Sequence, residues 1–171
     1  QISSNMYEDK RERIEYWDFR KVNTKEFTHG LHPYPAMMIP QVARELIKNY
    51  GENAESIIDP FMGSGSTLVE AFLTDNIKNL YGFEINPLAI LITKVKTNEI
   101  NLSLVLKHKE ELNQSYSKIE KDFIDFKNIK FWFKKYIIDD LSKIRKYIFS
   151  INNDSVRNFF LVTFSETIRK V

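Results

Sequence analysis

The most informative stretch of the sequence is a glycine-rich turn with a carboxylate at its start. It reads Asp59-Pro60-Phe61-Met62-Gly63-Ser64-Gly65-Ser66-Thr67 and follows an apolar run that ends at Asp59. Glycines let a ligand approach the backbone closely, and the free N–H groups of a following helix point toward such a ligand. The stretch is therefore a candidate cofactor turn. The alternative is a tight turn between a strand and a helix that binds nothing.

The composition of this turn disfavours a phosphate-bearing ligand. No Gly-Lys-Ser or Gly-Lys-Thr follows, as a phosphate loop requires, and Leu68 stands where a dinucleotide fingerprint has its third glycine. Glu84 ends the next apolar run, 19 positions after Gly65. A carboxylate at that separation suits the two hydroxyls of a ribose. Together the turn and Glu84 predict an adenosine ligand without phosphates; in the alternative interpretation, Glu84 is a surface residue.

Three stretches resemble motifs of the amino-group DNA methyltransferases, which methylate cytosine N4 or adenine N6. The glycine-rich turn resembles the first motif, and Gly82-Phe83-Glu84-Ile85-Asn86-Pro87-Leu88-Ala89 resembles the second. The upstream stretch Thr28-His29-Gly30-Leu31-His32-Pro33-Tyr34-Pro35-Ala36 resembles the tenth, which precedes the first in permuted members of the family. The resemblance covers about residues 25–100, in the permuted order.

The resemblance implies that these motifs bind S-adenosylmethionine. Asp59 and the backbone of residues 61–65 would hold the methionine moiety, and Glu84 would bind the ribose. Ile85 and Pro87 would flank the adenine. The complete set of cofactor-binding candidates is Phe27, His32, Pro33, Tyr34, Pro35, Asp59, Pro60, Phe61, Gly63, Ser64, Gly65, Thr67, Glu84, Ile85, Asn86 and Pro87.

The resemblance also implies that residues 32–35 line the far side of the cofactor. Their two prolines fix an extended loop that leads into the next helix. Without the resemblance, this loop is only a rigid lead into a helix, and His32 is an ordinary polar loop residue. Phe61 would then suit a core as well as a pocket wall.

The motif that carries out methyl transfer in this family is missing from the sequence. It needs Ser, Asn or Asp followed by Pro-Pro and an aromatic residue, whose oxygens accept the hydrogens of the base amine while the ring stacks on the flipped base. The sequence contains no Pro-Pro, so no catalytic residue is assigned. We therefore expect the cofactor-binding part of a restriction-modification DNA methyltransferase, inactive alone. The catalytic and target-recognition parts would lie downstream or on a partner subunit.

Two other functions remain open. A non-catalytic DNA-binding or assembly subunit could retain the cofactor fold without turnover. A small-molecule or RNA methyltransferase is disfavoured by the permuted motif order. Gln1 and a last helical pattern without a terminal cap are typical of a piece of a longer chain.

The elements that must position the motifs alternate between helix and strand. Apolar periodicity predicts a helix from Ala36 to Asn49, stopped by Gly51. A buried strand is predicted at residues 56–59 and a second strand at residues 80–83. Such alternation implies a parallel sheet with helical crossovers, in which ligands bind at the carboxyl ends of the strands.

The ends of the next helices are predicted from capping signals. Thr67 and Glu70 have the spacing of a capping box, and Asn76 is expected to end that helix in the left-handed conformation. Asn86 and Pro87 are expected to be the N-cap and first position of another helix.

The chain changes character after about Ile100, because the last 71 residues contain neither glycine nor proline. Helical periodicity marks two amphipathic segments, residues 133–148 and 156–168. The predicted fold class is α/β, a Rossmann-like class I methyltransferase core with a partial parallel sheet and flanking helices, followed by a mostly helical segment. The predicted organisation is an N-terminal extension (1–24), an S-adenosylmethionine-binding portion (25–100) and a helical insertion or subdomain (101–171).

The charge is unevenly distributed, although the net charge is only +2. Residues 51–90 carry six acidic side chains against one lysine and would repel phosphate backbones. Residues 121–150 carry eight Lys and Arg against four Asp, interleaved with Phe, Trp and Tyr. That composition fits either a nucleic-acid contact or a solvated helix face. The expected partner is double-stranded DNA.

Other classes of protein are disfavoured by composition. The chain has no cysteine and three histidines, so we expect no metal site. No uninterrupted apolar run has the roughly 18 residues that a membrane-spanning helix requires, and Gln1 to Arg20 has no apolar core of a signal peptide. We expect a cytoplasmic protein.

Overall fold

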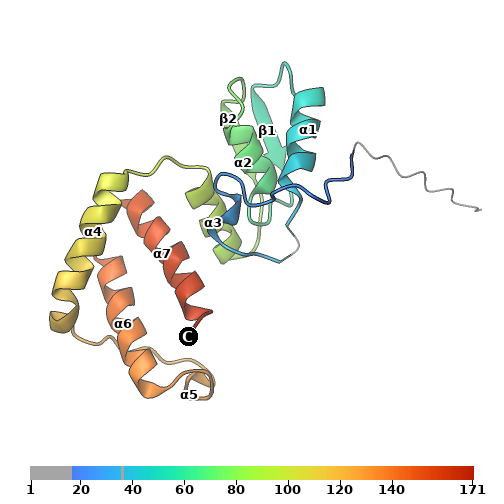
Figure 1. The fold of residues 1–171 in the computed structure, drawn as a ribbon. Helices are drawn as coiled ribbons and strands as arrows, with labels where there is room; N and C mark the ends of the chain where they lie inside the picture. The colour runs from blue at the N-terminus through green and yellow to red at the C-terminus, as the bar shows by residue number, and fades with distance from the viewer. Residues whose placement is uncertain (1–16, 36) are drawn as a thin grey trace, which may run out of the picture.

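The computed structural model describes residues 17–35 and 37–171, and it is a mixed α/β structure with a small parallel sheet (Figure 1). Most of the extension predicted at residues 1–24 therefore lies outside the described residues. The elements are η2 (His29–Leu31), α1 (Pro40–Tyr50), β1 (Ser56–Asp59), α2 (Ser66–Phe72), β2 (Asn79–Gly82), α3 (Pro87–Lys96), α4 (Leu102–Ser115), η3 (Tyr116–Lys118), α5 (Ile129–Trp132), α6 (Lys135–Phe149) and α7 (Asp154–Ile168).

The sheet consists of β1 and β2, which pair in parallel with Asp59 opposite Gly82. The first strand was predicted with the observed bounds, whereas β2 begins and ends one residue earlier than expected. Ile57 and Leu80 pack on a core formed by α1 and α2, but Ile58 on the other face is 64% exposed. The prediction of a buried strand was therefore wrong, because only one face of this sheet is covered by the described residues.

Helix α1 starts at Pro40, four residues later than predicted, and Ala36 lies outside the described residues. Proline favours the first position of a helix, and it disfavours helical geometry in the preceding Ile39. The predicted stop at Gly51 is confirmed, since its N–H donates to the Ile47 carbonyl.

Helix α2 begins directly after the glycine turn, with Gly65 as its N-cap. The predicted capping box was wrong, because the buried Glu70 side chain instead binds His29 and Arg44. Asn76 was also misassigned. Its side chain donates to the carbonyls of the loop after α1 rather than ending α2 in the left-handed region.

Helix α3 has the predicted start, with the Asn86 side chain accepting from the Leu88 N–H and Pro87 at the first position. It packs on α7 through Ile92, Val95 and Val162. Because α2 also contacts α3, this helix joins the sheet region to the helical part of the chain (Figure 1).

The part beyond residue 100 is mainly helical, as predicted. Helices α6 and α7 correspond to the two predicted amphipathic segments, although α6 starts at Lys135 and leaves Phe133 outside it. Val105 of α4, Ile151 and Val156 form the core of this part. Within residues 17–35 and 37–171, no helix is long and apolar enough to cross a bilayer, and no cluster of three potential metal ligands occurs.

Candidate cofactor site

The glycine turn and the loop that carries Glu84 lie side by side at the carboxyl ends of β1 and β2. The Phe83 N–H donates to the Asp59 carbonyl at 3.0 Å, and the Met62 N–H donates to the Phe83 carbonyl at 3.2 Å. Adjacent strands are about 4.8 Å apart, so these bonds bring both predicted cofactor motifs to one edge of the sheet. Ligands in open α/β sheets bind at this edge.

Two residues of the turn adopt left-handed backbone conformations that favour glycine, Gly63 with φ of +51° and Gly65 with φ of +82°. They differ in their surroundings. A Cβ on Gly65 would lie 2.6 Å from Thr93 Cγ2, whereas the nearest atom to a Cβ on Gly63 is Tyr34 Cε1 at 4.0 Å. Gly65 therefore allows α3 to approach the turn, and Gly63 leaves the opposite side open.

Helix α3 also holds the turn through its polar side chains. Thr93 Oγ1 donates to the Gly63 carbonyl at 3.3 Å, and Lys96 Nζ donates to the Ser64 carbonyl at 3.1 Å. Burial lowers the pKa of Lys96 to about 8. Sequence reasoning missed Lys96, because nothing in its local pattern distinguishes a buried lysine from a solvated one.

The two carboxylates at the strand ends each use one oxygen to organise their own loop. Asp59 Oδ1 accepts from the Phe61 N–H at 3.0 Å. Glu84 Oε1 accepts from the N–H groups of Ile85 and Asn86 at 2.8 and 2.9 Å. The second oxygen of each carboxylate makes none of these bonds and can accept from a ligand. Amine and hydroxyl donors are the groups that such oxygens bind.

Tyr34 forms a wall between two adjoining hollows. One, of about 400 Å³, is lined by the turn from Asp59 to Thr67 together with Met37 and Met38. The other, of about 600 Å³, lies among residues 32–35, Asn86, Leu88 and Arg169. Asn86 Nδ2 donates to the Tyr34 hydroxyl at 3.1 Å, so the upstream loop is tied to the Glu84 loop.

The residues at the turn fit the methionine and ribose parts of S-adenosylmethionine. Ser64 Oγ is buried and has no hydrogen-bond partner among the described residues, and Ser64 lines the hollow of about 400 Å³. A buried hydroxyl without a partner costs free energy, which a polar ligand group could recover. The free oxygens of Asp59 and Glu84 can accept hydrogen bonds from a ligand, and Gly63, which has no Cβ, leaves space beside the turn.

Some of the predicted cofactor-binding residues line these hollows, and others do not. Pro33, Tyr34, Pro35, Asp59, Phe61, Gly63, Ser64, Thr67 and Asn86 line one or both, and so does His32, although its side chain is 2% exposed. Pro60, Gly65, Glu84, Ile85 and Pro87 border the site without lining either hollow. Phe61 and Ile85 are 90% and 97% exposed, which does not fit the core position considered for Phe61.

Phe27 and His32 have roles that the sequence did not indicate. Phe27 lies beneath Arg44, whose guanidinium carbon is 5.7 Å from the ring centroid, and it is not part of either hollow. His32 Nδ1 donates to the Pro33 carbonyl at 2.8 Å, which leaves Nε2 to accept from Ser165 Oγ at 3.3 Å. Arg169 donates to the same carbonyl, so α7 supports the upstream loop.

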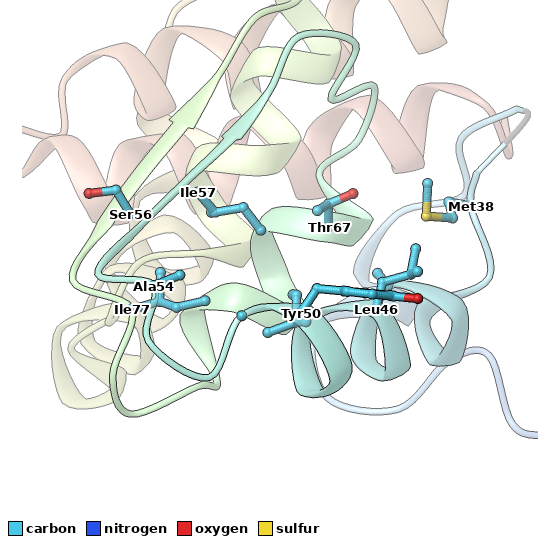
Figure 2. A pocket seen from close by; sticks show the side chains of 11 residues that line it. Met38, Leu46, Tyr50, Ala54, Ser56, Ile57, Thr67 and Ile77 are labelled. Carbon is cyan, nitrogen blue, oxygen red and sulfur yellow. The ribbon is translucent and has the colours of Figure 1, made fainter.

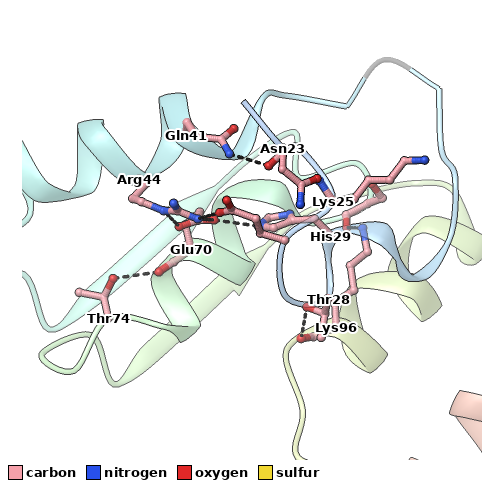
Figure 3. A network of polar contacts seen from close by, with 11 residues as sticks. Asn23, Lys25, Thr28, His29, Gln41, Arg44, Glu70, Thr74 and Lys96 are labelled. Carbon is pink, nitrogen blue, oxygen red and sulfur yellow. Dashed lines mark hydrogen bonds and ion pairs between the residues drawn. The ribbon is translucent and has the colours of Figure 1, made fainter. Parts of the chain in front are cut away.

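A buried polar network fixes the other end of that loop (Figure 3). His29 Nε2 donates to Glu70 Oε1 at 2.8 Å, and Arg44 Nε donates to Glu70 Oε2 at 2.8 Å. Arg44 also pairs with Glu26, and Gln41 donates to the Asn23 carbonyl. Burial raises the pKa of Glu70, but the hydrogen bonds from His29 and Arg44 outweigh it and leave the pKa below its ordinary value.

A third hollow, of about 340 Å³, lies between α1 and β1 (Figure 2). Its lining is mostly apolar and includes Met38, Leu46, Tyr50, Ile57 and Ile77. Thr67 lines both this hollow and the hollow of about 400 Å³ beside the turn. It offers no converging charged groups, so it is a poorer candidate for the adenosine site than the hollows beside the turn.

Comparisons with known proteins identify related sequences. A family of N6 and N4 enzymes described as DNA methylase matches residues 1–95. The type II methyltransferase M.MvaI of Kocuria varians is 38% identical over 170 residues, which cover 92% of this chain and 37% of the relative. M.MjaII of Methanocaldococcus jannaschii is 38% identical over 96 residues, 53% of this chain and 18% of the relative. The chain thus spans well under half of either relative, and no solved structure matches it significantly.

Proposed function

This chain belongs to the N4/N6 DNA methyltransferase family, and from that membership we infer that it is the S-adenosylmethionine-binding portion of a restriction-modification methyltransferase. The observation that carries the inference is the meeting of Asp59, the glycine turn and Glu84 at one edge of the sheet. The methyltransferase relatives named above supply the reaction class.

Each part of the cofactor has a proposed partner. The free oxygen of Asp59 and the turn from Phe61 to Gly65 would hold the methionine moiety, with Ser64 Oγ as a further partner. The free oxygen of Glu84 would accept from the ribose hydroxyls, while its other oxygen keeps the loop in place. Ile85 and Pro87 would flank the adenine.

The upstream loop would close over the methionine side. Tyr34 stands against Gly63 and is tied to Asn86, which leads into α3. Phe27, His32, Pro33 and Pro35 were proposed as direct contacts. The positions of Phe27 and His32 favour a supporting role for these two instead, because Phe27 packs on Arg44 and His32 bonds to Pro33 and Ser165.

The bound cofactor supplies an activated methyl group on a sulfonium. The acceptor in this family would be the exocyclic amine of a flipped cytosine or adenine in double-stranded DNA. The sequence has no Pro-Pro-aromatic motif to accept the hydrogens of that amine. This chain therefore orients the cofactor, and we expect no methyl transfer by it without a catalytic part supplied in cis or by a partner.

Ligand selectivity measured by calorimetry tests the assignment. We expect S-adenosylmethionine and S-adenosylhomocysteine to bind, and ATP and NAD to bind far more weakly, because the turn has no phosphate-binding lysine or third glycine. Gly63→Val should abolish cofactor binding, since a β-branched residue does not tolerate φ of +51° and would fill the open side of the turn. If ATP bound as tightly as S-adenosylmethionine, or if Gly63→Val left the affinity for S-adenosylmethionine unchanged, the assignment of this site to S-adenosylmethionine would be wrong.

A further inference from the structure

Some of the lysines and arginines in residues 121–150 form ion pairs with carboxylates, and others do not. Three cations of this segment form ion pairs with nearby carboxylates: Lys121 with Asp139 at 2.6 Å, Arg145 with Asp122 at 2.7 Å and Lys146 with Glu120 at 3.5 Å. Their charge is largely neutralised locally. These three cations fit the interpretation of residues 121–150 as a solvated helix face.

The unpaired charge is concentrated in the nine residues from Lys127 to Lys135. Four exposed lysines lie there, Lys127, Lys130, Lys134 and Lys135, and the stretch contains no Asp or Glu. None of the four forms an ion pair within the described part of the chain. Lys130 lies in short α5, Lys134 and Lys135 are the N-cap and first residue of α6, and these three line one hollow.

Exposed aromatic residues occur within or close to the same segment. Phe131 and Trp132 of α5 are 80% and 67% exposed, and their rings meet edge to face with centroids 5.1 Å apart. Phe123 and Tyr136 are 86% and 60% exposed. Large rings in contact with water are unfavourable, so four of them together mark a surface that is covered in the functional state.

A hollow of about 540 Å³ lies within this surface. Its lining includes Phe123, Lys130, Lys134 and Lys135, and Asp125 is the one carboxylate among its lining residues. We name the surface the lysine-aromatic patch, and it comprises Phe123, Lys127, Lys130, Phe131, Trp132, Lys134, Lys135 and Tyr136.

We propose that the lysine-aromatic patch binds the backbone of duplex DNA. The proposal rests on the proposed function for the choice of DNA as the polyanion. Lysines without protein carboxylates are free to neutralise phosphates, and the rings can contact sugars and base edges beside them. The acidic lobe at residues 51–90 would repel the same phosphates, so the cofactor region is the poorer place for the backbone. An apolar protein partner would not need four unpaired lysines.

Salt dependence of DNA binding tests the proposal on the full chain. The triple variant Lys130→Gln, Lys134→Gln and Lys135→Gln removes three charges from the patch. The matched control Lys48→Gln, Lys109→Gln and Lys118→Gln removes three exposed lysines elsewhere, none of them in an ion pair within the described residues. Affinity for a fluorescently labelled DNA duplex is measured by anisotropy over a range of salt concentrations.

The two variants should separate clearly. Each lost phosphate contact lowers the slope of log affinity against log salt by about 0.9, so we expect the patch variant to lose a slope of about 2 to 3 and at least about tenfold in affinity. The control should keep the wild-type slope. Phe131→Ala with Trp132→Ala should weaken binding at an unchanged slope, because it removes no charge.

Other results would overturn the proposal. Equal losses in the patch variant and the control would mean that DNA responds only to net charge. An unchanged slope in the patch variant would assign the patch to a protein partner instead. Calorimetry with S-adenosylmethionine on the wild-type chain and the patch variant keeps the two inferences apart. A wild-type chain that binds the cofactor but not DNA contradicts the patch alone, a wild-type chain that fails to bind the cofactor contradicts the proposed function, and the patch variant should bind the cofactor like the wild type.

Discussion

Gly65→Ala should destabilise the protein much more than Gly63→Ala, although both glycines have positive φ. Left-handed geometry costs an alanine about 1–2 kcal/mol at either position. Only at Gly65 would the new Cβ also lie 2.6 Å from Thr93 Cγ2 and 2.7 Å from Thr93 Oγ1. Overpacking of this kind typically costs about 1–3 kcal/mol more. We therefore expect the free energy of unfolding to fall by about 2–5 kcal/mol in Gly65→Ala and by about 1–2 kcal/mol in Gly63→Ala.

Urea unfolding followed by circular dichroism measures both values. A Thr93→Ala background supplies the control, because it removes the two atoms closest to the new Cβ and leaves Thr93 Cβ at 3.1 Å. The cost of Gly65→Ala should drop by about 1–3 kcal/mol in that background, whereas the cost of Gly63→Ala should not fall in the same way. Equal costs for the two glycines, or no coupling between Gly65 and Thr93, would refute the close approach of α3 to the turn.

Three other perturbations have defined outcomes. Glu70→Ala should lower the free energy of unfolding by about 3–5 kcal/mol in a urea titration, because it leaves the buried His29 without its carboxylate partner and Arg44 with Glu26 alone; a loss below about 1 kcal/mol would contradict the network. Burial lowers the pKa of Lys96 from 10.5 to about 8, so the unfolded chain binds more protons between these pH values. The free energy of unfolding of the wild type, relative to that of Lys96→Met, should therefore rise by roughly 3 kcal/mol from pH 8 to 10.5 in urea titrations. If this difference did not change with pH, burial of the Lys96 ammonium would be contradicted. Tyr34→Phe keeps the ring but loses the bond from Asn86, so S-adenosylmethionine affinity measured by calorimetry should fall by about two- to tenfold; unchanged affinity would place Tyr34 outside the cofactor wall.

Features that depend on neighbouring residues were predicted well. The Asn86 and Pro87 helix start, the stop at Gly51 and the first strand follow from signals within a few residues of each other. The sequence also contains the signal for the later start of α1, because proline is favoured at the first position of a helix and Pro40 occupies it. The alternation of strand and helix was enough to predict that the turn and the Glu84 loop would meet.

Features that depend on distant contacts were not predicted. Glu70 has capping-box spacing, yet it binds His29, which lies 41 positions away in the sequence. Lys96 contacts the Ser64 carbonyl across 32 positions and looks like an ordinary surface lysine in its helix. The burial of the first strand was misjudged for a related reason. Its apolar composition shows that both of its faces could be buried, but not that the described residues cover only one of them.

Calorimetry of Glu84→Gln tests whether the loop after β2 binds the ribose of S-adenosylmethionine through Glu84. Gln retains an oxygen that can accept from the Ile85 and Asn86 N–H groups, so the loop should keep its shape while the charge is lost. A charge-assisted hydrogen bond contributes about 1.5–3 kcal/mol, which predicts a loss of affinity of about tenfold to a hundredfold. Glu99→Gln, an exposed carboxylate just beyond α3, should bind like the wild type. Wild-type affinity in Glu84→Gln, or an equal loss in both variants, would contradict the assignment.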